Sequence, residues 1–423
     1  MKLHTKIFIG LLAAMILGVL IQLLGLQNFS SQYLSPFFET IGKIFLNSLK
    51  MIVIPIVFLS LFCGIVGEGK LQNLGRLGAR TIGFYLISSL LAILTGSVLV
   101  NLLRPGVGSN IPIPENAVVE IGKAKPWSDF IADIVPSNIF HVIASGDMVS
   151  VIFFAVMFSV FTYRVSEAAR SQIVSLFKAF LDVIINMTLF IINLAPYGVF
   201  CLVLNLIIDT GFDVFIPLAL YFATVVLGLT VHFFITLPLL LKIFTSLSPW
   251  KLMMAMSPSL LTAFSTASSS ATLPLTLACA QRRVGVDRRV SNFVLPLGAT
   301  VNMDGTALYE CVAAIFIAQA LGFELTLLQQ FTVIITALMA SIGAAGIPHA
   351  GLVMMVIIFD AVGLPLEAMG MIWGVDRILD MGRTMTNVWS DSTCAAIVAY
   401  AENEIDINVF HGVNVDVSMD QSL

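Results

Sequence analysis

The sequence predicts an all-α polytopic membrane protein, and three observations carry this prediction. Of the 423 residues, 58% are hydrophobic and only 11% are charged, whereas soluble proteins carry about 25% charged residues. Apolar runs recur along the chain, with lengths close to the roughly 20 residues that a helix needs to span a bilayer. Polar residues interrupt the last of these runs at helical spacings. The length would allow two or three soluble domains, but there is too little polar surface to cover them.

Charge and cysteine content exclude several other classes of protein. The 21 Lys and Arg against 25 Asp and Glu give a net charge of −4, and we find no basic patch of the kind that binds nucleic acid. The 5 cysteines show neither metal-ligand spacing nor a paired disulfide framework. We therefore expect a lipid bilayer, and no nucleic acid, as the environment of this chain.

Six apolar stretches in the first part of the chain predict membrane spans. They cover roughly residues 6–26, 38–66, 80–103, 144–163, 179–208 and 212–244. The first is interpreted as a retained span and not a signal peptide, because it is long, lacks an A-x-A cleavage site and leads into further spans. Lys and Arg gather in alternate loops, so the positive-inside rule places both termini in the cytoplasm of a multi-pass plasma (inner) membrane protein.

Residues 252–281 predict a re-entrant hairpin instead of a span. Their apolar sequence is interrupted by the serine-rich segment 265–272. A single crossing would place Arg282 and Arg283 outside, against the charge rule, whereas two half-length arms keep them inside. Such irregular backbone is tolerated at membrane depth only where it is buried in protein or lines a wet cavity.

A second set of interrupted segments follows the first hairpin. A seventh span, 290–322, is broken around residues 302–306, and a second hairpin, 326–362, is broken by the Gly- and Pro-containing segment 341–348. An eighth span over 364–401 and a polar tail complete the chain. A hairpin followed by a span thus occurs twice with opposite polarity, which indicates an inverted repeat with a binding site near the membrane midplane.

Five polar residues of the last span share one helical face. Their spacings are 4, 3, 4 and 4 residues, and they are Asp376, Asp380, Arg383, Asn387 and Asp391. A charge in hydrocarbon costs from about 2.5 to more than 10 kcal/mol, and one arginine cannot neutralise three aspartates. An arginine fork is suited to holding a carboxylate in two hydrogen bonds. The stripe therefore predicts a site for an anion.

The broken seventh span carries a second polar face. Asn302, Thr306 and Glu310 are four residues apart, and Asp304 lies in the break itself. Such oxygen-rich breaks suit hard cations such as Na⁺. Purely structural roles stay open as alternatives at this point. Arg383 could do no more than bridge Asp380 and the backbone, and Glu310 could be a neutral structural carboxyl. Asp376 is equally a helix-terminus partner or a ligand. Three isolated histidines are given no role: His141, His232 and His349.

Five segments carry a resemblance to a known family. They are KMIVIPIVFLSL (50–61), SSSATLPLT (268–276), LGATVNMDGTALYE (297–310), SIGAAGIPHAGLV (341–353) and DMGRTMTNVWSD (380–391). They resemble the dicarboxylate/amino acid:cation symporter family, which contains glutamate/aspartate transporters of the excitatory amino acid transporter type and neutral amino-acid exchangers. The resemblance implies eight spans, two hairpins, a homotrimer and an elevator-like movement. It implies scaffold segments 1–79 and 129–208, transport-domain segments 80–128 and 209–402, and a cytoplasmic tail 403–423.

The resemblance also implies roles for individual residues toward the substrate. Arg383, assisted by Thr306, is expected to hold the side-chain carboxylate, Asp380 the α-amino group and Asn387 the α-carboxylate. Thr384 is expected beside them. Backbone groups of the two hairpins are expected to close the pocket, and these belong to Ser269, Ser270, Ile347 and Gly351.

For cations, the resemblance implies three sodium sites and one proton carrier. The first site is expected to combine Asp391 with carbonyl groups of Gly298, Asn302 and Asn387. The second would use Asp304 with Asn302, Tyr85, Ser88 and Ser89. The third would use backbone carbonyls of Thr300, Ser341, Ile342 and Ala344. Glu310 matches the glutamate associated with proton co-transport in animal members, where archaeal members have glutamine, so H⁺ is a further candidate ion.

Two departures from the family pattern affect what can be expected. Met381 stands where animal glutamate transporters have arginine, and Ala267 stands where archaeal members have one at the first hairpin tip. The resemblance therefore gives no expectation for potassium counter-transport.

The leading prediction is cation-coupled uptake of L-aspartate or L-glutamate. Within the family, C4-dicarboxylate, cystine and neutral amino-acid transport are the alternatives, and an ion channel is the alternative from another class. An enzyme is not expected. The serine-rich tip has no paired base, and the chain has neither GxSxG nor HExxH.

Overall fold

The computed structural model describes residues 3–26, 29–66, 76–109, 135–145, 148–210, 215–344, 346 and 349–411. Within these ranges the chain forms helices, and its extended pairing is limited to one β-bridge between Val286 and Ile405. Five of the described helices are long and apolar enough to cross a membrane, and shorter apolar helices accompany them. The predicted all-α class is confirmed. The count of eight spans stays a prediction.

The described part of the N-terminal half consists mainly of apolar helices. Their bounds are α1 (Leu3–Leu23), η1 (Ser30–Leu34), α3 (Ser35–Val66), α4 (Arg76–Leu103), α6 (Ile139–Ser145), α7 (Met148–Thr162), α8 (Glu167–Asn193) and α9 (Ala195–Thr210). The helices lie within a few residues of the predicted stretches, except at one position. The stretch 179–208, predicted as one span, is divided between α8 and α9.

This division is a correction, and its cause is a proline. Pro196 is the second residue of α9. Proline has no N–H, so Pro196 cannot donate to a carbonyl one turn earlier and the helix ladder is interrupted there. Hydropathy does not depend on this restriction. The apolar pattern therefore predicted one helix where the structure has two, separated at Leu194.

The C-terminal half contains the interrupted segments. Its helices are α10 (Phe215–Val231), η3 (His232–Thr236), α11 (Leu237–Phe244), α12 (Pro249–Thr266), α13 (Ser269–Cys279), η4 (Ala280–Val284), α14 (Arg288–Val301), α15 (Asp304–Ala320), α16 (Leu327–Gly343), α17 (Ala350–Val362), η5 (Leu366–Met369), α18 (Gly370–Glu402) and α19 (Ile407–His411). The helices break at 267–268, at 302–303 and before 350, where the sequence predicted interruptions. In contrast, α18 runs without a break through its polar stripe.

The ends of these interrupted helices are set by local side-chain hydrogen bonds. Ser268 caps α13 by accepting a hydrogen bond from the Ala271 N–H, and Thr326 and Gln329 form a capping box at the start of α16. Such caps satisfy N–H groups that a helix start leaves without partners. The polar residues of the breaks therefore have a structural use as well as a chemical one.

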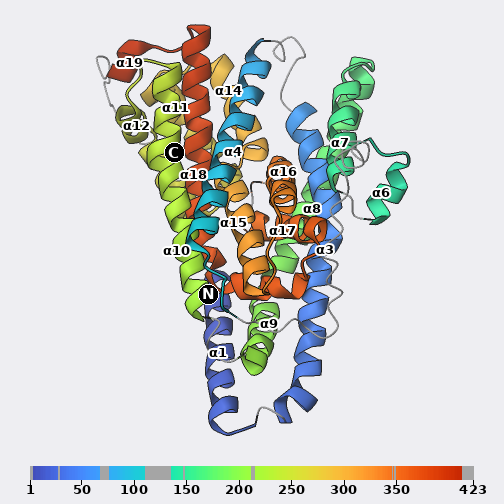
Figure 1. Ribbon diagram of the computed structural model, residues 1–423. Coiled ribbons are helices and arrows are strands. Elements are labelled where there is room, and N and C mark those ends of the chain that lie inside the picture. Colours follow the sequence, from blue (N-terminus) through green and yellow to red (C-terminus); the bar gives the residue numbers. More distant parts are fainter. Residues whose placement is uncertain are drawn as a thin grey trace.

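Two groups of helices pack side by side. In the first group, α1 packs on α9, and α3 packs on α7, α8 and α9. In the second group, α15 packs on α4, α10 and α18, while α12 and α14 also pack on α18. Figure 1 shows α12 and α19 at the same end as the C-terminal part of α18, with α1 and α9 at the opposite end. Helices α14, α16 and α17 contact α3 and so join the two groups.

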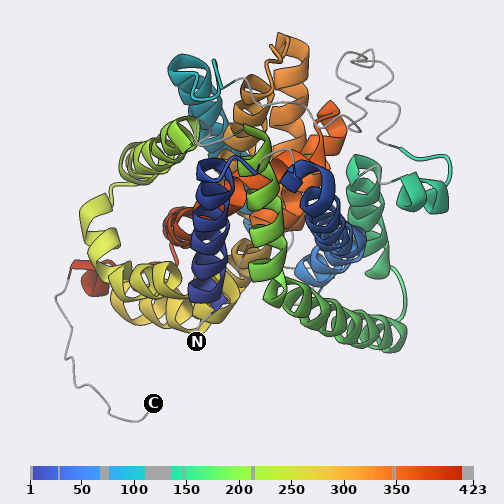
Figure 2. The same ribbon diagram turned by 90° about the horizontal axis from the view of Figure 1, so that it is seen from below.

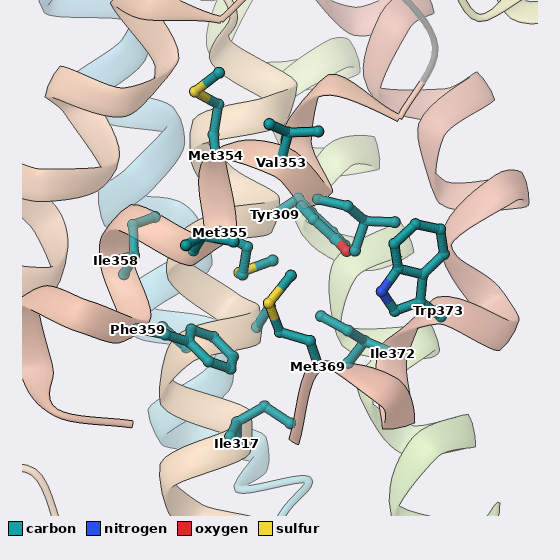
Figure 3. Close-up of a cluster of buried hydrophobic side chains, with 14 of the residues drawn as sticks. Tyr309, Ile317, Val353, Met354, Met355, Ile358, Phe359, Met369, Ile372 and Trp373 are labelled. Carbon is teal, nitrogen blue, oxygen red and sulfur yellow. The ribbon is translucent and has the colours of Figure 1, made fainter. Parts of the chain in front are cut away.

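The buried core lies around α15 and α17. Every residue of α15 except Gln319 is buried, whereas α8 buries only Thr188, Ile191 and Ile192 and lies along the edge of the molecule (Figure 2). Figure 3 shows Met355 of α17 and Met369 of η5 meeting near the centre of a cluster of buried apolar side chains. This packing fixes α15 and α17 against the N-terminal end of α18, where the polar stripe begins.

Candidate substrate and cation sites

The polar stripe of α18 is buried along its whole length. Asp376, Asp380, Arg383, Asn387 and Asp391 are 0%, 5%, 1%, 4% and 2% exposed. Their helical spacing places them on one face, as predicted. Charged groups buried to this extent need partners close by, and the structure divides those partners between two clusters.

The first cluster is centred on Arg383. Its Nη2 donates to Oδ1 of Asp376 at 2.9 Å and to Oδ1 of Asp380 at 2.8 Å. Its Nε and Nη1 are buried and have no hydrogen-bond partner among the described residues. The guanidinium is thus fixed by two carboxylates through one nitrogen, and two further donors stay available. Arg383 does bridge Asp380, as its structural alternative predicted, but this contact uses only part of its donor capacity.

An aromatic ring and a glycine limit the space around this guanidinium. Cζ of Arg383 lies 3.8 Å from the ring centroid of Tyr309, which is within the range of a cation–π contact. Tyr309 itself belongs to the buried apolar cluster (Figure 3). A methyl group added at Gly351 would lie 2.7 Å from Nη1 of Arg383. The unpartnered Nη1 therefore faces a spot that only a residue without a side chain leaves open.

Residues at the break before α13 and at the break before α17 contact each other. The Ser268 hydroxyl and the Ser270 N–H donate to the Gly346 carbonyl at 2.7 and 3.3 Å. The hydroxyl of Ser269 donates to the Ala299 carbonyl at 3.0 Å. The structure thus brings the predicted Ser269 and Ser270 to the second hairpin. Ile347, which was predicted with them, lies outside the described residues.

Asn387 and Thr306 connect the first cluster with the second. The Asn387 side chain accepts from the Gly305 N–H at 2.8 Å and donates to the Thr306 hydroxyl at 3.1 Å. Thr384 is buried beside them on α18, at 6% exposure. These contacts fix α18 to the start of α15, where the helix break exposes backbone groups.

Asp304 is the centre of the second cluster. Its Oδ1 accepts from the hydroxyls of Ser89 at 2.6 Å and Ser88 at 3.3 Å, both on α4. Its Oδ2 accepts from the Ser390 hydroxyl at 2.6 Å and lies 3.1 Å from Nε2 of His232. Asp304, Ser88 and Ser89, three of the five residues predicted for one cation site, are therefore brought together, whereas Ser390 and His232 were not predicted to lie there.

Asp391 lies in the same cluster with fewer partners. It accepts from Nδ2 of Asn302 at 2.9 Å. A methyl group added at Gly298 would lie 2.6 Å from the carboxyl carbon of Asp391 and 2.7 Å from the Tyr85 hydroxyl, so glycine leaves these groups room to meet. The Tyr85 hydroxyl donates to the Val294 carbonyl at 2.7 Å. A carboxylate with one strong donor in a buried position is suited to accept a cation.

The third predicted cation group lies where α14 and α16 pack together. Ser341 and Ala344 are both fully buried. The Ser341 hydroxyl donates to Leu338 at 2.9 Å and the Thr300 hydroxyl to Leu297 at 3.1 Å, each within its own helix. These bonds involve side chains, so they do not test the predicted role of the backbone carbonyls. That role stays a prediction for Thr300, Ser341, Ile342 and Ala344.

Glu310 follows Thr306 by one turn of α15. It is fully buried, and neither of its carboxylate oxygens bonds to a residue that the structure describes. An ionised carboxylate without donors is among the costliest groups to bury, whereas a protonated one is tolerated. This environment is suited to a carboxyl that carries a proton.

Several members of these clusters were not predicted from the sequence. Two histidines without an assigned role contact acids, since His232 meets Asp304 and His349 meets Asp376. Asp376 is a buried carboxylate seven residues into α18 and contacts His349, the residue directly before α17, so it is a partner of a helix terminus, as one of its two alternatives held. In the described ranges, no group of three or more His, Cys, Asp and Glu could hold a metal ion. A cation here would therefore depend on carbonyl, amide and hydroxyl oxygens together with one carboxylate.

Comparison with known proteins extends the resemblance beyond the motifs. Residues 3–401 match the model of the sodium:dicarboxylate symporter family. The chain is 33% identical over 419 residues to the proton/glutamate-aspartate symporter of Escherichia coli (strain K12), which covers 94% of this chain and 93% of that protein. It is 33% identical over 448 residues to human excitatory amino acid transporter 3, an alignment that covers 93% of this chain and 85% of that protein. The proton/sodium-glutamate symport protein of Geobacillus stearothermophilus is 32% identical over 407 residues, with 94% of each covered.

Proposed function

Because the chain belongs to the sodium:dicarboxylate symporter family, we propose that it couples uptake of L-aspartate or L-glutamate to inward cation gradients. It is a transporter of a multi-pass membrane type and not an enzyme. Relatives named as proton/glutamate-aspartate and proton/sodium-glutamate symporters support the substrate and both candidate ions. The single observation that carries the substrate class is Arg383, which is buried and keeps two donors without a partner among the described residues.

The substrate pocket is proposed to lie between α18 and the two helix breaks. Nε and Nη1 of Arg383, with Thr306, bind the side-chain carboxylate, because a guanidinium edge matches a carboxylate in two parallel bonds. Asp380 binds the α-amino group and Asn387 the α-carboxylate, with Thr384 beside them. Ser269, Ser270 and Gly351 supply backbone groups near Arg383, and Ile347 is proposed with them from the resemblance alone.

Na⁺ is proposed as a co-transported ion held in the second cluster. Asp391 with carbonyls of Gly298, Asn302 and Asn387 forms one site, and Asp304 with Asn302, Tyr85, Ser88 and Ser89 forms another. The third uses the carbonyls of Thr300, Ser341, Ile342 and Ala344. Asn387 is placed both in the substrate pocket and in one cation site, so binding of cation and substrate is expected to be linked, and the linkage must be reciprocal.

The architecture is proposed to be eight spans and two re-entrant hairpins, with cytoplasmic termini. The two packing groups support a division into a scaffold, 1–79 and 129–208, and a transport domain, 80–128 and 209–402. Gly64 and Gly343 lie at the border between them, where an added methyl group would approach Thr300 Oγ1 at 3.0 Å and Val57 Cγ1 at 2.7 Å. An elevator-like movement of one group against the other, in a homotrimer, is the proposed transport cycle.

Reconstitution in proteoliposomes tests this function. Na⁺, H⁺ and K⁺ gradients are imposed one at a time. We expect labelled aspartate or glutamate, but not succinate, to accumulate with an inward Na⁺ gradient, with an inward H⁺ gradient, or with each of the two. Liposomes without protein and liposomes with an ionophore are the controls. Succinate uptake without aspartate uptake would indicate a C4-dicarboxylate transporter, and flux that never exceeds the imposed solute gradient would indicate a channel.

Glu310→Gln tests the proton carrier. Glutamine keeps the shape of the side chain but cannot exchange a proton in this pH range. If Glu310 carries a proton inward with the substrate, wild-type uptake falls as the external pH rises, and the variant loses most of this dependence. Uptake between about pH 5.5 and 8.5 and the fluorescence of a trapped pH dye measure both effects. Gln319→Glu, on the same helix, is the matched control, and an unchanged pH profile in Glu310→Gln would contradict the assignment.

A further inference from the structure

His349 occupies an unusual backbone position in the second hairpin, directly before α17. Its φ of 63° lies in the left-handed region, which costs a side-chain-bearing residue energy that its surroundings must offset. Ala267, at the break between α12 and α13, has a φ of 52°, so both hairpins place a non-glycine residue in this conformation. Ala267 has no polar side chain, whereas His349 has an imidazole that is almost fully buried, at 3% exposure.

Three contacts join His349 to one face of α18. Its Nδ1 lies 2.8 Å from Oδ2 of Asp376, and since a carboxylate only accepts, Nδ1 carries the proton in this contact. Its backbone N–H donates to Oδ2 of Asp380 at 3.0 Å. Its ring stacks on Trp373, with 6.2 Å between centroids and 22° between planes. One residue of the hairpin thus contacts three successive turns of α18.

The same two carboxylates hold Arg383. Each uses Oδ1 for Nη2 of Arg383 and Oδ2 for His349. Arg377 lies further away, 3.8 Å from Oδ2 of Asp380. The docking of His349 and the orientation of the guanidinium therefore depend on the same pair of acids. All of these bonds join protein groups, so they need no atom of a substrate.

We propose that His349 is a positioning residue that latches the second hairpin onto α18, so that the pocket closes through protein contacts alone. This inference depends on the proposed symport function. A carrier that delivers net uptake must close and return without its substrate in every cycle, whereas in exchange it returns loaded. With substrate bound, the substrate's own groups bridge α18 and the hairpins, so the latch matters less. The latch therefore sets the rate of the unloaded return.

The test compares net uptake with exchange of labelled aspartate in proteoliposomes of the full-length protein. His349→Ala removes one hydrogen bond to a charged group, which corresponds to at least about a tenfold change in the closing equilibrium. We expect net uptake to fall about tenfold and exchange to stay within about twofold of wild type. His349→Gln keeps an N–H donor for Asp376 and is expected to restore at least half of the lost net uptake.

Two further variants separate the ring from the backbone. His349→Gly relieves the left-handed conformation and keeps the N–H bond to Asp380, so a latch formed by the imidazole predicts that it behaves like His349→Ala. Ala267→Gly is the matched control at the first hairpin and is expected to leave both rates unchanged. Equal loss of net uptake and exchange, from misfolding or from lost substrate affinity, would overturn the latch, and so would unchanged net uptake. Failure of the proposed function is distinct, because wild type itself would then exchange no acidic amino acid.

Discussion

Replacing Arg383 by cysteine is expected to abolish aspartate and glutamate uptake at substrate concentrations that saturate the wild type. Truncating one partner of a buried, hydrogen-bonded charge pair costs about 2–5 kcal/mol, and each 1.4 kcal/mol is tenfold. The apparent affinity for acidic amino acids should therefore fall by about 30-fold to 1,000-fold or more. The measurement is concentration-dependent uptake together with binding of labelled aspartate to purified protein.

The same substitution is expected to admit small neutral amino acids such as serine. It removes the cation that selects a second carboxylate, and it leaves Asp380 and Asn387 for the amino-acid groups. This gain distinguishes lost selectivity from lost folding, since an unfolded protein gains no substrate. Arg104→Cys is the control, because Arg104 is 56% exposed and pairs at 3.2 Å with a Glu324 that is 89% exposed, a type of surface pair worth little. Undiminished aspartate binding by Arg383→Cys would refute the assignment.

Replacing Asp391 by asparagine is expected to raise the Na⁺ concentration for half-maximal uptake by at least about 100-fold. Asparagine preserves the shape of the side chain but removes the negative charge that a buried cation needs. At an effective dielectric constant of about 20, two unit charges 4 Å apart interact by about 4 kcal/mol. The expected rise in the half-maximal Na⁺ concentration is smaller than this interaction energy alone would give, because carbonyl and amide oxygens of the site remain. Na⁺ titrations of aspartate uptake and binding measure it.

Reciprocal linkage sharpens the test of Asp391. If Na⁺ strengthens aspartate binding, aspartate must strengthen Na⁺ binding by the same factor, and Asp391→Asn should reduce both effects together. Asp360→Asn is the matched control, since Asp360 is exposed near the end of α17 and lies outside both clusters. An unchanged Na⁺ dependence in Asp391→Asn would show that this carboxylate binds no coupling ion.

Much of the fold could be predicted from particular sequence features. The low content of charged residues required a membrane environment, and the interruptions at 265–272, 302–306 and 341–348 marked breaks that the helices show. The five-residue stripe from Asp376 to Asp391 lies on one face because a helix repeats every 3.6 residues. The division between α8 and α9 was missed because it depends on the geometry of Pro196 and not on hydropathy.

The candidate site could be predicted in its residue types but not in its contacts. Periodicity along one helix determines which side chains share a face, and it contains no information about the helix that this face meets. Asp376 pairs with His349 across 27 positions, Asp304 with His232 across 72, and Ser89 with Asp304 across 215. A histidine looks isolated in the sequence when its partner is distant along the chain.

The sequence by itself determined that a few of the charged residues of this protein lie within apolar segments and therefore need partners. A buried charge without compensation is too costly to keep, so composition and spacing alone require a network there. Only the tertiary structure decided which polar groups pair with each buried charge. It gave one nitrogen of Arg383 to two aspartates and left two donors over, it surrounded Asp304 with hydroxyls, and it left Glu310 without a donor among the described residues. The reason is physical: hydrogen bonds act over about 3 Å, and only packing brings distant parts of the chain that close.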